Sequence, residues 1–234
     1  MLAAIAGALP TGPVPVSLHA PDGFLSPLIA AVMWAVTAVV LAYAVKKTNA
    51  TFDERAIPLL GVTAAFIFAA QMFNFQVIGG TSGHLLGGVL AAVLLGPWAG
   101  TLVMACVVAV QGLVFQDGGL VVMGANIFNM GIIGTLGGYA LYVGLCRLLG
   151  GEERGRLPAA GIAAWVSVVA AAVAMALELG LSGTTDLAVA LTTMIGIHAL
   201  IGIGEALVTV AALAFVRVVR PDLLTLRDAR PAAA

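Results

Sequence analysis

Long apolar runs with almost no charge dominate this sequence and leave few folds open to it. They cover about residues 26–45, 57–75, 84–115, 120–146, 159–181 and 187–216. A helix that crosses the hydrocarbon core of a bilayer needs about 20 mostly apolar residues. Only 9% of the 234 residues are charged, whereas soluble domains carry about 25%. The sequence therefore predicts an all-α fold, a polytopic helical bundle in a lipid bilayer.

The basic residues predict how often the chain crosses the membrane. They form three groups: Lys46, Lys47 and Arg55; Arg147, Arg154 and Arg156; and Arg217, Arg220, Arg227 and Arg230. Lys and Arg beside membrane spans prefer the cytoplasmic side, so an even number of crossings should separate neighbouring groups. A break of the run 84–115 at Gly96–Trp98, where Pro97 can begin a new helix, provides that number. We therefore expect about seven transmembrane helices, with the N-terminus outside and the C-terminus in the cytoplasm.

This topology places two of the three histidines, His19 and His84, on the outer face. Histidine is the commonest metal ligand in proteins, and Asp22 is a candidate for a further donor. The segment "PDG" around Asp22 is equally typical of a simple turn. The loop "IGGTSGHLLGG" around His84 contains glycines that let backbone approach a ligand closely. In the alternative interpretation, His84 caps a helix and the glycines that follow it serve helix packing.

Four segments closely resemble one known family of membrane proteins. They are "LHAPDGFLSP" at 18–27, "QMFNFQVIGGTSGHLLGG" at 71–88, "GANIFNMG" at 124–131 and "HALIGIGEAL" at 198–207. These segments resemble the CbiM/NikM family, the substrate-binding membrane component of cobalt and nickel energy-coupling factor transporters. The resemblance covers about residues 18–217 and implies that the chain captures and imports Co²⁺ or Ni²⁺. It also implies that the chain is not an enzyme.

The resemblance further implies partners and a location. The expected partners are a transmembrane coupling component, paired cytoplasmic ATPase subunits and a small accessory membrane subunit. We expect no nucleic-acid partner, because all ten Lys and Arg residues belong to the three groups above. The sequence has no G-x-x-x-x-G-K loop, so no nucleotide is expected to bind this chain. The implied location is the bacterial inner membrane, with the metal site on the extracellular or periplasmic face.

In the family, the mature protein begins Met-His, and four nitrogens hold the metal in a nearly planar arrangement. They are the terminal amine, the amide nitrogen and imidazole of that histidine, and a second imidazole from the "GTSGH" loop. The matching residues here are Leu18, in the place of the methionine, His19 and His84. All-nitrogen square-planar geometry suits Ni²⁺, and cobalt can adopt it. The resemblance therefore implies a metal site of Leu18, His19 and His84.

The sequence departs from this family pattern at its N-terminus, because seventeen residues precede Leu18. We expect residues 1–17 to be a cleaved leader or the product of a misassigned start. Residues 18–217 are then the transmembrane metal-binding domain. Residues 218–234 are expected to form a disordered cytoplasmic tail.

Two other functions fit parts of the sequence. The segment "GTSG" resembles the G-x-S-G of intramembrane serine proteases, with Ser82 as nucleophile and His198 as base. This interpretation leaves His19 and His84 without a role. Haem binding by paired histidines needs ligands that face each other within the bilayer, and His19 and His84 are expected at its outer boundary.

The remaining polar residues of the apolar segments allow a functional or a structural interpretation. His198 and Glu205 share one face of the last span, as functional residues or as polar groups that pin this helix to the bundle. Asn126 and Asn129 are expected to form hydrogen bonds between helices. Glu178 and Asp186 flank the last outer turn and are expected to lie in a solvated loop.

Overall fold

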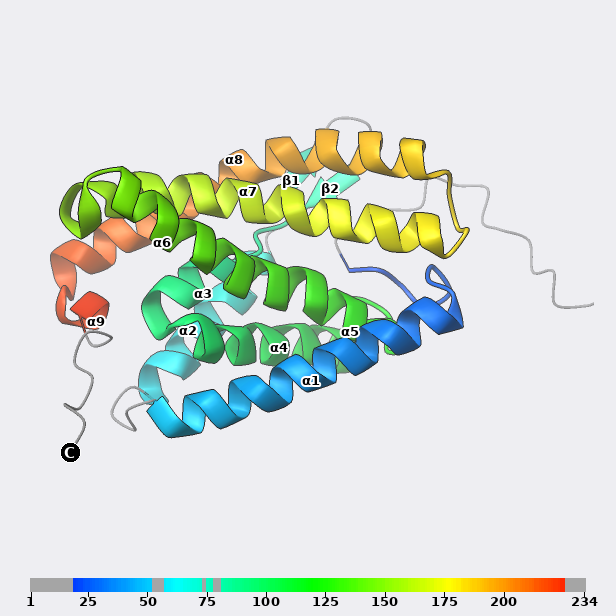
Figure 1. Cartoon of the computed structure of the whole chain (residues 1–234), viewed down its shortest axis with the longest axis horizontal. Coiled ribbons are helices and arrows are strands. Elements are labelled where there is room, and N and C mark those ends of the chain that lie inside the picture. Colours follow the sequence, from blue (N-terminus) through cyan, green and yellow to red (C-terminus); the bar gives the residue numbers. More distant parts are fainter. Residues whose placement is uncertain (1–18, 52–56, 73–74, 78–80, 226–234) are drawn as a thin grey trace, which may run out of the picture.

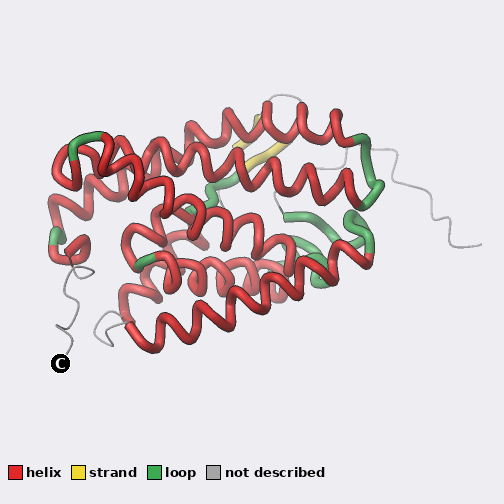
Figure 2. Tube along the Cα trace, in the orientation of Figure 1, coloured by secondary structure: helices red, strands yellow, loops and turns green. Residues whose placement is uncertain are grey.

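The computed structural model describes residues 19–51, 57–72, 75–77 and 81–225. In these ranges the regular secondary structure is helical, apart from one short hairpin (Figures 1 and 2). The elements are α1 (Pro27–Thr51), α2 (Ile57–Gln71), β1 (Phe75–Val77), β2 (Thr81–Gly83), α3 (Gly88–Leu95), α4 (Pro97–Val114), α5 (Met123–Asn126), the π-helix η2 (Ile127–Gly137), α6 (Gly138–Leu148), α7 (Gly151–Leu181), α8 (Leu187–Val219) and α9 (Asp222–Thr225). Strands β1 and β2 pair antiparallel, with Gln76 opposite Ser82.

Five helical segments in the described ranges are long and apolar enough to cross a membrane. They are Pro27–Ala50, Pro97–Val114, Met123–Leu148, Glu153–Leu181 and Leu187–Val219. Helix α2 has 15 residues and α3 has 8, and at 1.5 Å per residue they extend over about 22 and 12 Å. A hydrocarbon core is about 30 Å thick. The helical membrane fold is therefore confirmed, while seven crossings and the orientation of the termini stay predictions.

The break predicted inside the run 84–115 is confirmed. Helix α3 ends at Leu95, Gly96 has a φ of 84°, and Pro97 is the first residue of α4. A positive φ suits glycine, and proline needs no hydrogen-bond partner for its nitrogen at the first helical position. Local backbone chemistry alone decides this turn.

Several other boundaries differ from the apolar runs. Helices α1, α7 and α8 extend to Thr51, back to Gly151 and on to Val219. Each extension carries Lys, Arg or Glu, which are good helix formers. Each helix therefore continues beyond its apolar segment. Helix α2 ends earlier than expected, at Gln71, because the chain enters the hairpin. The run 120–146 forms one continuous helix over α5, η2 and α6, whose π-helical middle had no visible signal in the sequence.

The elements form an elongated bundle (Figure 1). Helices α7 and α8 run antiparallel along one side, α1 runs along the opposite side, and α3 and α4 lie between them. The C-terminal end of α1, the α6–α7 turn and the C-terminal end of α8 meet at one end of the bundle. The start of α1 and the α7–α8 turn lie at the other end. The basic residues that the structure describes therefore belong to segments near a single end: Lys46, Lys47, Arg147, Arg154, Arg156, Arg217 and Arg220.

The outer surface is more apolar than that of a soluble protein. Large apolar side chains such as Leu28, Val39, Leu207 and Val218 are exposed on the outside. The interior holds a set of polar side chains that are almost fully buried: His19, Gln71, His84, Gln111, Asn126, Asn129, Glu178, His198 and Glu205. In membrane proteins such groups face the bundle interior and mark functional regions. These residues surround the site described next.

Candidate metal-binding site

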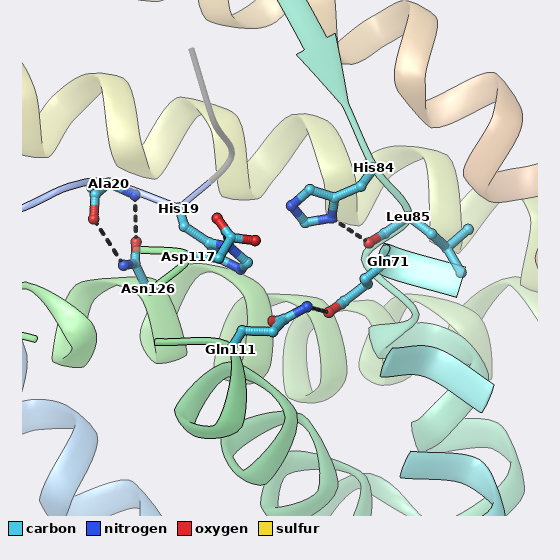
Figure 3. Close-up of polar contacts among 8 residues, drawn as sticks. All are labelled: His19, Ala20, Gln71, His84, Leu85, Gln111, Asp117 and Asn126. Carbon is cyan, nitrogen blue, oxygen red and sulfur yellow. Dashed lines mark hydrogen bonds and ion pairs between the residues drawn. The ribbon is translucent and has the colours of Figure 1, made fainter. Parts of the chain in front are cut away.

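His19 and His84 meet in the interior, and their rings lie 5.0 Å apart between centroids with 39° between the ring planes. They are 1% and 4% exposed. Figure 3 shows the two rings facing each other across the site. Leu18 lies outside the described residues. The structure thus brings together the two side chains that the sequence singled out for metal binding.

Asn126 holds the segment that carries His19. Its Oδ1 accepts from the backbone N–H of Ala20 at 2.8 Å, and its Nδ2 donates to the Ala20 carbonyl at 3.1 Å (Figure 3). The N–H of Gly119 also donates to the Ala20 carbonyl, at 2.9 Å. Asn126 thus connects α5 to the N-terminal segment that precedes α1, beside the site, and not to another helix as expected.

Asp22 acts as a backbone anchor. Its carboxylate accepts from the N–H groups of Leu120 at 3.1 Å and Val121 at 2.8 Å. A carboxylate that caps backbone N–H groups is satisfied by them. The structure therefore favours the structural role for Asp22 over that of a metal donor.

The loop between α4 and α5 contributes two residues that sequence reasoning missed. Asp117 Oδ1 lies 3.1 Å from His19 Nδ1, which places a partly exposed carboxylate beside a buried ring. Gly118 has a φ of +102°, and a Cβ at this position would lie 2.9 Å from the Cβ of His19. Any other residue would therefore push His19 away. In the sequence, "QDGG" is typical of an ordinary turn and carries no signal of this contact.

His84 has the hydrogen bonding expected of a metal ligand. Its Nδ1 lies 2.8 Å from the Leu85 carbonyl, and Nε2 is buried without a partner in the described part of the chain. A proton on Nδ1 that is donated to a backbone carbonyl leaves the lone pair on Nε2, as in most metal-binding histidines. Burial, helped by the neighbouring His19, lowers the pKa of His84 to about 4. The ring is therefore neutral near pH 7 and able to bind a cation.

Glu205 and Gln71 hold the loop that follows His84. Glu205 accepts from the N–H of Leu86 at 2.7 Å and from that of Gly87 at 2.8 Å. Gln71 Nε2 donates to the Leu86 carbonyl at 2.7 Å. Gln71 Oε1 accepts from Gln111 Nε2, also at 2.7 Å (Figure 3). The structural interpretation of Glu205 is thus confirmed, with the His84 loop as its partner. Helices α2, α4 and α8 together position this loop.

We expect Glu205→Ala to weaken metal binding by about 10- to 100-fold, the usual effect of losing a group that orients a ligand. The change also leaves two buried N–H groups unpaired, at about 1–3 kcal/mol each, so the melting temperature should fall. Metal titration and thermal melting in detergent measure both effects. Thr209→Val, which alters another buried polar side chain of α8, is the control. Wild-type affinity in Glu205→Ala would contradict a positioning role.

Glu178 does not lie in the solvated loop that the sequence predicted. Its side chain is buried and accepts a hydrogen bond from Asn129 Nδ2 at 3.0 Å. The reason is that α7 continues to Leu181, which turns Glu178 toward the bundle interior. Asp186 is exposed and caps α8 by accepting from Ala188 and Val189 N–H groups, which agrees with its expected place in an outer loop.

The donors available around His19 and His84 limit what the site can be. In the described ranges, no group of three or more His, Cys, Asp or Glu side chains is arranged to hold a metal ion. Two imidazoles alone make an incomplete site, so a tightly bound cation would need further donors from backbone or from the segment before His19. The side chain of Ser82, the nucleophile of the protease alternative, lies outside the described part of the structure.

Comparison with known proteins points in the same direction. Residues 19–223 match the model of the family CbiM, described as the cobalt uptake substrate-specific transmembrane region. A Haloquadratum walsbyi protein, whose name assigns it provisionally to metal transport, is 41% identical over 88% of this chain and 93% of its own length. The fused nickel transport protein NikMN of Rhodobacter capsulatus is 35% identical over 92% of this chain and 66% of its own length.

Solved structures show the same fold. A crystal structure of a transition metal transporter superposes with a TM-score of 0.77 and 36% identity, over 86% of this chain and 93% of that one. A truncated transition metal transporter superposes with a TM-score of 0.75 and 35% identity, over 85% of this chain and 97% of that one.

Proposed function

Because the chain belongs to the CbiM family of cobalt uptake substrate-specific transmembrane proteins, we propose that it captures Co²⁺ or Ni²⁺ at His19 and His84 and delivers the ion across the membrane. The observation that carries the proposal is the meeting of the two buried rings, 5.0 Å apart, with the lone pair of His84 Nε2 unused. The family is one of metal transport and not of enzymes. The protease alternative receives no support.

The proposed ligands are the amine of residue 18, the amide nitrogen and imidazole of His19, and Nε2 of His84. The amine and the adjacent amide nitrogen close a five-membered chelate ring. The same amide nitrogen and Nδ1 of His19 close a six-membered ring. Three nitrogens then share one plane, and His84 supplies the fourth. Asp117, 3.1 Å from His19 Nδ1, would offset part of the charge of the cation. Because the amide must lose its proton, binding should weaken in acid.

Binding and uptake test this proposal directly. Titration of the purified protein with Ni²⁺ or Co²⁺ should show one tight site. Cells that hold the chain together with a coupling component and ATPases should accumulate the metal. A protein that binds neither ion would contradict the proposed function.

We further propose that the chain lies in a bacterial inner membrane with its C-terminus in the cytoplasm and the metal site toward the outside. The shared end of the segments that carry the described basic residues supports this orientation (Figure 1). The short helices α2 and α3 do not change this orientation. Trp98 at the start of α4 makes an edge-to-face contact with Tyr43 late in α1, so the chain returns to the basic end before α4 begins. A topology with five crossings and one with seven therefore place each terminus on the same side of the membrane.

The proposed partners are a transmembrane coupling component, paired ATPase subunits and a small accessory membrane subunit. Helix α2 offers a surface for docking, because Ala65 and Ala69 are spaced as a small-x-x-x-small pair that permits close helix approach. Both residues are exposed. Their exposure favours an external partner over internal packing.

Ala65→Trp is expected to reduce metal uptake at least about tenfold without changing metal affinity, because the indole would hold a partner helix away. Uptake in cells with the coupling component and ATPases, and titration of the purified variant, measure the two quantities. Val39→Trp, at another exposed position on α1, should transport normally. Loss of both binding and uptake in Ala65→Trp would indicate misfolding, whereas wild-type uptake with unchanged affinity would contradict the docking surface.

A further inference from the structure

A second group of metal-binding atoms lies beside the His84 loop, in a small cavity between η2, α7 and α8. Leu86, Asn129, Met130, Ala171, Ala172, Met175, Met194 and His198 line it. Its open space is about 10 Å³, which is the room that a single water molecule or ion needs. Leu86 connects it to the first site, since it follows His84 by two residues.

His198 repeats the arrangement seen at His84. Its Nδ1 lies 2.7 Å from the Met194 carbonyl, so the proton sits on Nδ1 and the lone pair on Nε2. Nε2 is buried without a partner among the described residues, and the side chain is 3% exposed. A metal-binding histidine usually donates one ring N–H to a backbone carbonyl or carboxylate and binds the metal through the lone pair of its other nitrogen.

Asn129 supplies a second unused acceptor to the same cavity. Its Nδ2 donates to Glu178 Oε2 at 3.0 Å, which orients the amide and leaves Oδ1 buried without a partner in the described ranges. Two buried acceptors without a donor favour a cation or a water molecule between them. Glu178 is connected to the cavity through this hydrogen bond with Asn129. Its carboxylate would reduce the cost of a positive charge inside the membrane.

We propose that this cavity is a second, weaker binding site for the transported Co²⁺ or Ni²⁺, with His198 Nε2 and Asn129 Oδ1 as ligands and the thioethers of Met130, Met175 and Met194 around the ion. This inference rests on the proposed function. Thioethers are soft donors that bind Ni²⁺ and Co²⁺ less well than imidazole does. The ion is therefore held less tightly here than between His19 and His84, as a transfer step requires.

The test counts metal ions in tag-free protein by equilibrium dialysis against Ni²⁺ or Co²⁺. Wild type should bind one tight and one weaker equivalent. His198→Asn keeps a side-chain N–H that can donate to the Met194 carbonyl but lacks Nε2. It should keep the tight equivalent, weaken the second at least about tenfold and slow uptake. Met175→Leu, of nearly equal volume, should weaken the second equivalent and reduce the sulfur-to-cobalt absorption in the Co²⁺ spectrum.

The outcomes separate this inference from the proposed function. One equivalent in both wild type and His198→Asn, with equal uptake, would show that the cavity holds only water, and would overturn the second site while leaving the first. Tight binding that survives the loss of the His84 imidazole would instead overturn the proposed function. Thermal melting of His198→Asn near that of wild type shows that any loss of metal is not a loss of fold.

Discussion

His84→Ala is expected to lower the affinity for Ni²⁺ or Co²⁺ by about 100- to 1,000-fold while the protein stays folded in the membrane. Four-donor metal sites contribute about 10–16 kcal/mol of binding energy. One donor of four is therefore worth about 3–4 kcal/mol, which corresponds to that loss of affinity. His84 Nε2 is buried with an unused lone pair and faces the ring of His19. Isothermal titration of the purified variant gives the measurement.

A second substitution at the same position separates the ligand from the fold. His84→Asn retains a side-chain N–H that can reach the Leu85 carbonyl, the partner of His84 Nδ1, and it lacks Nε2. Both variants should melt near the wild-type temperature and bind metal weakly. Affinity equal to that of wild type in either variant would remove His84 from the site.

The free amine of residue 18 is expected to have an effect of similar size. A chain that begins at residue 18 offers an amine, whereas a chain that keeps residues 1–17 offers only a second peptide nitrogen there. The five-membered chelate ring then cannot close. Keeping residues 1–17 should weaken binding by about 3–4 kcal/mol, again one donor of four. His19 is already held in place through Ala20 and Asn126, so the comparison tests the donor and not the position of the ring.

Two measurements decide this prediction. Intact-mass analysis or N-terminal sequencing of protein from its native membrane identifies the first residue. Titration of two forms, one starting Met-His at residue 18 and one keeping residues 1–17, compares their affinities. Tight binding by a chain with an intact Met1 would refute the amine ligand, and Asp117 beside His19 would become the next candidate donor.

Local patterns in the sequence were enough for the helical membrane fold, and the sequence also singled out the two histidines whose rings the structure brings together. Apolar run length depends only on neighbouring residues, so five candidate spans could be recognised directly. The turn at Gly96 and Pro97 follows from the backbone preferences of these two residues alone. The pairing of His19 with His84 came from counting crossings between basic groups, and the resemblance to the family named the same residues.

The supports of the site depended on contacts that no local pattern contains. Asp117 reaches His19, Asn126 holds Ala20, and Glu205 binds the loop after His84 from 118 and 119 residues away. A buried polar group inside a membrane must find a partner, so the sequence could predict that Glu205 and Asn126 would be paired. Which backbone group each would meet was decided by the way the helices pack. That packing also turned Glu178 inward and ended α2 at Gln71 and α3 at Leu95, and only the tertiary structure could decide it.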